Sequence, residues 1–224
     1  MIFSQKKKKL ILKDKLGINI SIIKGHLSVG NCVKFGTYWQ SNNEEKEPIE
    51  WLVLDVEKGK TVLLISKYAL DCKQYHKRNI PITWENSDLR KWLNEEFINN
   101  AFSEEEKEKI QLSEVINNTY IRGGRSGVWG ENNTEDKLFL LSIDEALKYY
   151  NSNEKRQCKP TQFAVKNNGS KHEVSGICNW WLRSPGEYKS SATRVFDGEI
   201  CRCITSVDLD NTCVRPALWV NLES

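Results

Sequence analysis

Two adjacent tryptophans in "ICNWWLRSPG" (Ile177–Gly186) constrain the fold more than any other stretch of the chain. Successive side chains on a β-strand point to opposite faces of the sheet, so Trp180 and Trp181 cannot form one stacking platform. One indole must face a core, and the other must be covered by a helix or a loop. Pro185 and Gly186 then end the strand in a turn. The stretch therefore predicts a central, buried strand rather than a ligand-stacking surface.

Further strands are indicated by apolar runs that are separated by turn residues. "IEWLVLDVEKGKTVLLIS" (Ile49–Ser66) predicts two apolar strands joined by a Lys-Gly turn. "TRVFDGEICRCI" (Thr193–Ile204) predicts a hairpin that turns at Asp197-Gly198. "CVRPALWVNL" (Cys213–Leu222) is expected to close the sheet. The segments between residues 117 and 136 and between 151 and 175 are polar, and we expect them to be loop-rich inserts.

Three helices are indicated by caps and by apolar spacing. In "ENSDLRKWLNEEFINNAF" (Glu85–Phe102), either Asn86 or Ser87 can cap a helix that carries its apolar residues on one face. These residues are Leu89, Trp92, Leu93 and Phe97. The pairs Ser103/Glu106 and Ser142/Glu145 have capping-box spacing and predict two further helices.

Composition places the chain among ordinary globular proteins, because 39% of its 224 residues are hydrophobic and 28% are charged. No apolar run approaches the ~18 residues of a membrane span. The N-terminal region lacks the long apolar stretch of a secretory signal, and seven cysteines at irregular spacing make a poor disulfide framework. We therefore expect a cytoplasmic protein.

We expect residues 1–31 to be a basic appendage in which the Lys6–Lys9 run is solvated, and residues 32–224 to be one domain.

Two basic and aromatic stretches are candidate partner-binding segments. The first lies in the 117–136 insert and combines residue types that are enriched at interaction hot spots, namely Tyr120, Arg122, Arg125 and Trp129. The second follows a strand and contains Tyr75, His76, Lys77 and Arg78. Such side chains can also stack on single-stranded bases or bind phosphates. The alternative for the first segment is a surface loop whose Trp129 folds back onto the domain.

Several blocks in fixed order resemble a bacterial family called domain of unknown function 6273. These blocks are "EPIEWLVLDV", "LLISKYALDC", "ITWENSDLRKWLNEEFINNAFSEEEKEKI", "DKLFLLSIDEA", "WWLRSPG" and "VRPALWVNL". The resemblance covers roughly Val33–Leu222. The family in turn resembles the C-type-lectin-like scaffold of the formylglycine-generating enzymes. This resemblance implies an α+β fold with irregular antiparallel sheets, two to three helices and long loops.

Core roles follow from the helix face, from the central strand and from the motifs of the resemblance. We expect six side chains to be structural, namely Trp92, Trp180, Trp181, Arg183, Arg215 and Trp219.

Catalytic and metal chemistry receives little support from the sequence. An oxidase of the formylglycine-generating type needs two metal-binding cysteines a few residues apart, whereas Cys201 and Cys203 are separated by one residue, with Cys213 expected opposite them. Thiolates on one strand face can bind copper or zinc, but buried apolar cysteines are more common. His172 and Cys178 have no third, orienting group nearby in the sequence. We expect no catalysis, cofactor or metal.

The combined prediction is a non-catalytic recognition protein that binds a protein or ribonucleoprotein complex through loops. One narrower possibility is a phage or mobile-element inhibitor of a host defence complex, such as an RNA-guided CRISPR nuclease. Two alternatives remain open: a metal-dependent oxidase, and a direct RNA- or DNA-binding protein. The net charge of +3 and the pI of 8.4 give nucleic-acid binding little support, because dedicated binders usually exceed a pI of about 9.

Overall fold

One side of the molecule is a four-stranded antiparallel sheet. The computed structural model describes residues 27–57, 60–117, 132–168, 176–201 and 205–222, and the backbone of residues 120–121 and 128–129. The sheet has the order β1-β2-β3-β13. Its strands are β1 (Cys32–Trp39), β2 (Lys46–Glu57), β3 (Thr61–Ser66) and β13 (Ala217–Asn221). The apolar hairpin predicted from Ile49–Ser66 is thus confirmed as the β2–β3 pair.

Strand β1 contains a bulge that brings its backbone against the helical layer. The β1–β2 register shifts between Lys34 and Thr37, and Gly36 lies there at φ +67°. A Cβ atom on Gly36 would lie 2.6 Å from the carbonyl oxygen of Ala101, so only glycine allows this close approach.

A second, mixed sheet has the order β11-β10-β9-β12-β4, which makes β9 the central strand, as predicted. Its strands are β4 (Asp71–Cys72), β9 (Trp180–Pro185), β10 (Ala192–Phe196), β11 (Glu199–Cys201) and β12 (Cys213–Val214). The predicted hairpin is confirmed, because Asp197 and Gly198 turn β10 into β11 with φ of +49° and +84°. The C-terminal stretch does not close a single sheet, since β12 joins this sheet and β13 joins the first.

The predicted helices are present, and their caps are those expected. Ser87 caps α1 (Asp88–Trp92), which continues through a π-helical turn, η1 (Leu93–Phe97), into α2 (Ile98–Ala101). Ser103/Glu106 and Ser142/Glu145 form complete capping boxes at α3 (Glu104–Lys109) and α4 (Ile143–Tyr149).

The two inserts are more regular than expected. Within the second insert, Ser152 caps α5 (Asn153–Arg156) and Thr161 caps α6 (Gln162–Lys166). The first insert contains the β6 (Tyr120–Ile121) and β7 (Val128–Trp129) pair, and its last strand, β8 (Thr134–Asp136), pairs with β5 (Ser113–Val115), which precedes the insert. The expectation of irregular loops was therefore wrong for these residues.

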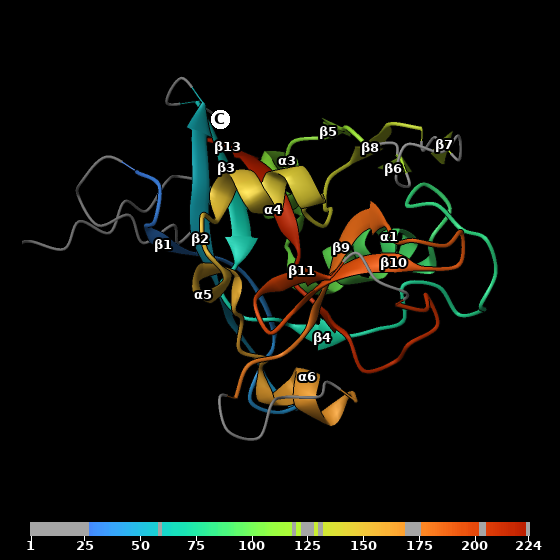
Figure 1. The fold of residues 1–224 in the computed structure, drawn as a ribbon. Coiled ribbons are helices and arrows are strands. Elements are labelled where there is room, and N and C mark those ends of the chain that lie inside the picture. The colour runs from blue at the N-terminus through green and yellow to red at the C-terminus, as the bar shows by residue number, and fades with distance from the viewer. Residues whose placement is uncertain are drawn as a thin grey trace, which may run out of the picture.

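The elements form an α+β fold with one continuous hydrophobic core. In Figure 1 the four-stranded sheet stands at the left, the five-stranded sheet lies to its right, α3 and α4 lie above, and α6 lies below. None of the helices in the described ranges has the length and apolar character that a membrane crossing requires.

The six side chains expected to be structural differ in their burial. Trp180 and Trp181 are both fully buried, and their indole N–H groups donate to the carbonyl oxygens of Arg156 (3.0 Å) and Lys73 (2.9 Å). The Arg215 guanidinium is also buried and lies 5.1 Å from the Trp180 ring. Trp92 and Trp219 are partly buried against the core.

Candidate functional site

Arg183 is the centre of a buried polar network at the end of strand β9. Its Nε donates to Asn117 Oδ1 (3.1 Å), and its two Nη atoms donate to the carbonyl oxygens of Leu140 (2.7 Å) and Ile116 (2.8 Å). Both Nη atoms also donate to the carboxylate of Glu145. All five N–H groups of the guanidinium therefore have acceptors, which a buried arginine requires.

Asn117 links this network to both ends of the 118–131 segment. Its backbone N–H donates to Asn133 Oδ1 (3.1 Å), and its Nδ2 donates to the carbonyl oxygen of Asn132 (2.8 Å). The β5–β8 ladder pairs the residues immediately outside these contacts. The two ends of the segment are thus held together by one asparagine, which the buried Arg183 fixes in turn.

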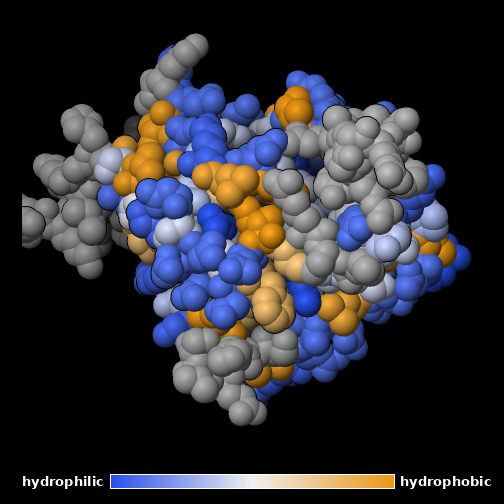
Figure 2. Space-filling view, in the orientation of Figure 1, coloured by the Kyte–Doolittle hydropathy of each residue, from blue (hydrophilic) through white to orange (hydrophobic). Residues whose placement is uncertain are grey.

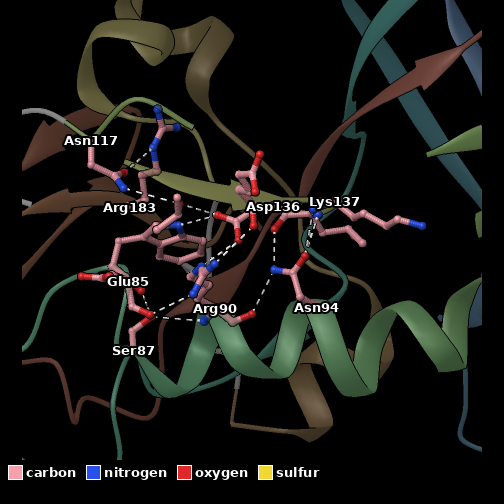
Figure 3. A network of polar contacts seen from close by, with 12 residues as sticks. Glu85, Ser87, Arg90, Asn94, Asn117, Asp136, Lys137 and Arg183 are labelled. Carbon is pink, nitrogen blue, oxygen red and sulfur yellow. Dashed lines mark hydrogen bonds and ion pairs between the residues drawn. The ribbon is translucent and has the colours of Figure 1, made fainter. Parts of the chain in front are cut away.

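Asp136 is a second centre, at the end of β8, and its side chain is fully buried. It accepts hydrogen bonds from Trp84 Nε1 (3.0 Å) and Thr134 Oγ1 (2.7 Å) and forms an ion pair with Arg90 Nε (2.7 Å). Arg90 is partly exposed and also donates to the carbonyl oxygen of Glu85 (3.0 Å). Figure 3 shows Arg90 reaching from α1 toward Asp136.

Asn94 joins the same helix to the chain that follows β8. Its Oδ1 accepts from the backbone N–H groups of Lys137 and Leu138, each at 3.0 Å, and its Nδ2 donates to the carbonyl oxygen of Leu138 (2.9 Å). Helix α1 and strand β8 are therefore fixed relative to each other (Figure 3).

A polar hollow of about 580 Å³ lies beside this network, between α1 and β8. Five acidic and three basic side chains line it. The acidic ones are Glu85, Asp88, Glu95, Glu135 and Asp136, and the basic ones are Arg90, Lys91 and Lys137. The hollow thus has a net negative lining.

Two exposed apolar side chains flank β5, with Ile116 at the end that leads into the 118–131 segment and Leu112 at the opposite end. Leu112 is 56% exposed and also lines the hollow, and Ile116 is 52% exposed. A separate exposed leucine, Leu147, lies on α4 and is 48% exposed. Figure 2 shows hydrophobic side chains gathered near the middle of the pictured face, over α4.

The first predicted partner-binding segment begins directly after Asn117 in the chain. The backbones of Tyr120 and Trp129 pair across the β6–β7 ladder. Arg122 and Arg125 lie outside the described residues.

The second predicted segment is corrected in part. Tyr75 is 1% exposed and donates its hydroxyl to the carbonyl oxygen of Arg183 (2.8 Å), so it belongs to the core. His76 is also buried, with Nδ1 2.8 Å from Asp88 Oδ2. Lys77 and Arg78 are exposed, and Lys77 lines a hollow of about 320 Å³ beside Trp92.

The cysteines are not arranged as the oxidase alternative requires. Cys201 is disulfide-bonded and lies on the edge strand β11, whereas Cys213 lies on β12, with β9 and β10 between them. The expectation that Cys213 lies opposite Cys201 was therefore wrong. Cys203 and His172 lie outside the described residues. Within the described ranges, no three His, Cys, Asp or Glu side chains converge as a metal site would require.

Several residues of this network could not be found from the sequence. Arg183 was recognised through its motif, but Asn117, Asp136 and Arg90 were not singled out. The spacing of Ser142 and Glu145 indicated the cap but not that Glu145 also binds Arg183.

The fold and the site define an α+β domain in which a buried polar network joins Asn117 to Asn132 and Asn133, the residues that flank the 118–131 segment. Residues 59–222 match the model of a family described as Domain of unknown function (DUF6273), and the chain belongs to this family. No curated protein and no solved structure matches the chain.

Proposed function

We propose that this chain is a non-catalytic recognition protein whose 118–131 segment, with Leu112 and Ile116 beside it, binds another protein. The main observation behind the proposal is that Asn117, just before the segment, forms two hydrogen bonds to Asn132 and Asn133, just after it. Asn117 is itself held by a hydrogen bond from the buried Arg183. Binding segments are characteristically held by a rigid scaffold of this kind.

The chemistry of the surface favours a protein over a nucleic acid as the partner. Exposed Leu112 and Ile116 offer apolar contact area, whereas the lining of the adjacent hollow is net negative and would repel a phosphate backbone. Aromatic and arginine side chains within the segment are the types that dominate protein interfaces.

Two finer proposals accompany this one. The first is that the fold is a C-type-lectin-like scaffold of a cytoplasmic protein, supported by two irregular sheets with long connections between them. The second is that the partner is a host defence complex such as an RNA-guided CRISPR nuclease. This stays a prediction that the same binding experiment can address.

The proposal is tested by affinity purification with the full chain, followed by measurement of affinity for the recovered partner. Replacing Arg122, Arg125 and Trp129 by alanine should weaken binding at least tenfold without lowering the melting temperature. Normal binding by the folded triple variant would contradict the proposal.

A matched pair of exposed leucines provides the control. Leu112→Asp should weaken binding, because exposed Leu112 flanks β5, the strand that leads into the segment, whereas Leu147→Asp on α4 should leave it unchanged. The affinity should also change little between low and moderate salt. A steep loss with salt would instead indicate phosphate contacts and a nucleic-acid partner.

A further inference from the structure

Four buried thiols from distant parts of the chain lie in two opposed pairs at the five-stranded sheet. Cys72 lies on β4 and Cys213 lies on β12. The backbones of Cys158 and Cys178 form a separate, isolated β-bridge, and both thiols are free. Their exposed fractions are 6%, 0%, 3% and 4%, respectively. The Cys72 thiol donates to the carbonyl oxygens of Asp210 (3.0 Å) and Thr212 (3.3 Å), and the Cys213 side chain lies close enough to those of Cys72 and Cys178 to be affected by both. The proposed recognition function uses none of them.

Cys72 and Cys213 have the backbone arrangement of a cross-strand disulfide. They are directly opposed on antiparallel strands. They do not hydrogen-bond to each other through the backbone: Cys72 N donates to Asp71 Oδ1, and Cys213 N donates to the carbonyl oxygen of Asn179. The hydrogen bond between the two strands is instead made by the neighbouring residues, from Lys73 N to the carbonyl oxygen of Thr212. The two cysteines therefore form a non-hydrogen-bonded pair, in which opposed Cα atoms lie about 4.5 Å apart. This spacing is within the range of disulfides, about 4.4–6.8 Å.

The pKa values of the two thiols are shifted in opposite directions. Hydrogen bonds from Cys178 and Cys72 lower the pKa of Cys213 to about 5, although burial acts in the opposite direction. The hydrogen bond to Cys213, together with burial, raises the pKa of Cys72. The pKa of Cys213 is thus lowered and that of Cys72 raised, and Cys72 is the more exposed of the two.

The other cysteine pair is less suited to oxidation. Cys178 N donates to the carbonyl oxygen of Cys158 (2.8 Å), so these residues occupy a hydrogen-bonded position, where opposed side chains lie farther apart. Burial raises the pKa of Cys158, but Cys178 and the positive charge of Arg215 outweigh this effect and lower it below its ordinary value.

We propose that Cys72 and Cys213 are a redox site that forms a reversible disulfide on reaction with a hydroperoxide. The Cys72 sulfur attacks a peroxide oxygen and passes its proton to Cys213. The O–O bond breaks, and the departing hydroxide takes that proton back from Cys213 to become water. The Cys213 thiolate then attacks the sulfenic sulfur of Cys72, the S–O bond breaks, and the second hydroxide takes a proton from solvent. One hydrogen peroxide is reduced to two water molecules, and two sulfurs are oxidised to one disulfide.

The disulfide would fix the edge of the second sheet. Strand β4 has two residues and is held to the sheet through β12. The chain that leaves β4 at Lys73 accepts the indole hydrogen bond of Trp181 and lines the hollow beside Trp92. Oxidation should therefore rigidify this edge and raise the resistance of the chain to denaturant.

Peptide mapping of the reduced, full-length protein after exposure to hydrogen peroxide tests the proposal. After free thiols are blocked, cleavage before aspartate places Cys72 in Asp71–Ser87 and Cys213 in Asp210–Ser224, each without another cysteine. We expect these two peptides to be joined, two hydrogens lighter than their sum, and to separate with dithiothreitol. The denaturant midpoint of the oxidised protein should be higher than that of the reduced protein.

Two variants distinguish this pair from the other thiols. Cys72→Ser should abolish the joined peptide, whereas Cys32→Ser, which removes an exposed thiol, should leave it unchanged. Recovery of Cys72 and Cys213 as blocked thiols after peroxide treatment would overturn the proposal. So would joining of Asp210–Ser224 to Asp144–Phe196, the peptide that contains Cys158 and Cys178.

Discussion

Arg183 on β9 and Glu145 on α4 form a two-point ion pair, in which Nη2 donates to Oε1 over 2.9 Å and Nη1 donates to the other carboxylate oxygen. The same carboxylate accepts the backbone N–H of Ser142 (2.8 Å) and so completes the cap of α4. One glutamate thereby fixes both the start of a helix and the orientation of the arginine that binds Asn117.

Glu145→Gln should lower the free energy of unfolding strongly, because it leaves a buried guanidinium without its counter-charge. Breaking a buried pair costs about 3–5 kcal/mol, and we expect the lower end because Glu145 remains 31% exposed. The control is Glu106→Gln in the other capping box, which has no arginine partner and should lose about 0.3–1 kcal/mol. Equal losses in urea denaturation would contradict the role of the ion pair.

Trp181→Ala should destabilise the domain by about 3–5 kcal/mol, because the indole is fully buried and the substitution leaves a cavity. It also removes the hydrogen bond to the carbonyl oxygen of Lys73. Trp39→Ala, at a partly exposed tryptophan under Lys46, should cost clearly less. An unchanged melting temperature for Trp181→Ala would show that this side chain does not support the core.

Gly198→Ala should be more destabilising than Gly30→Ala, although both glycines have positive φ, +84° and +88°. Each substitution incurs backbone strain of about 1–2 kcal/mol. Only at Gly198 would the new Cβ overlap the carbonyl oxygen of Asn153, whereas nothing lies within 4 Å of it at Gly30. Thermal unfolding of the two variants measures the difference, and equal shifts would exclude a close β-turn contact with α5.

The stability contributed by Cys213 should rise with pH. Its pKa is lowered to about 5 in the folded protein, against about 8.5 in an unfolded chain. Between these values the unfolded state binds more protons, so the contribution is complete above about pH 8.5 and is lost as the pH falls toward 5.

The difference in unfolding free energy between wild type and Cys213→Ser should therefore grow from pH 5.5 to pH 8. It can grow by no more than about 1.4 kcal/mol per pH unit. Cys32→Ser should leave this slope unchanged. A difference that is constant with pH would mean that Cys213 remains a thiol.

The parts of the fold that the sequence predicted correctly are those set by local chemistry. The spacing of Ser103 and Glu106 is sufficient to define a cap, and Asp-Gly is sufficient to define a hairpin turn. Helix α5 was missed because four residues carry no periodic signal. It depends instead on buried Arg156, which donates to the carbonyl oxygens of Gly198 and Tyr150, each at 2.8 Å.

The site was predicted less completely, because its contacts join residues far apart in the chain. Arg183 meets Glu145 and Asn117 across 38 and 66 positions, and no local pattern specifies such pairs. Tyr75 was misplaced for a related reason. The lysines and arginine around it are exposed, and they made a buried tyrosine resemble part of a polar surface.

The attachment of both ends of the 118–131 segment at Asn117 has a practical consequence for engineering. Because Asn117 joins the two ends from outside the segment, in addition to the β6–β7 ladder within it, the residues between β6 and β7 can be exchanged in sequence and number while the hydrogen bonds at the base are retained. The entropy of closing a loop rises only slowly with its length, by about 0.6 kcal/mol for each doubling. The domain is therefore suited to the display of randomised peptide libraries at this position, with Arg183 and Glu145 left unchanged as the support.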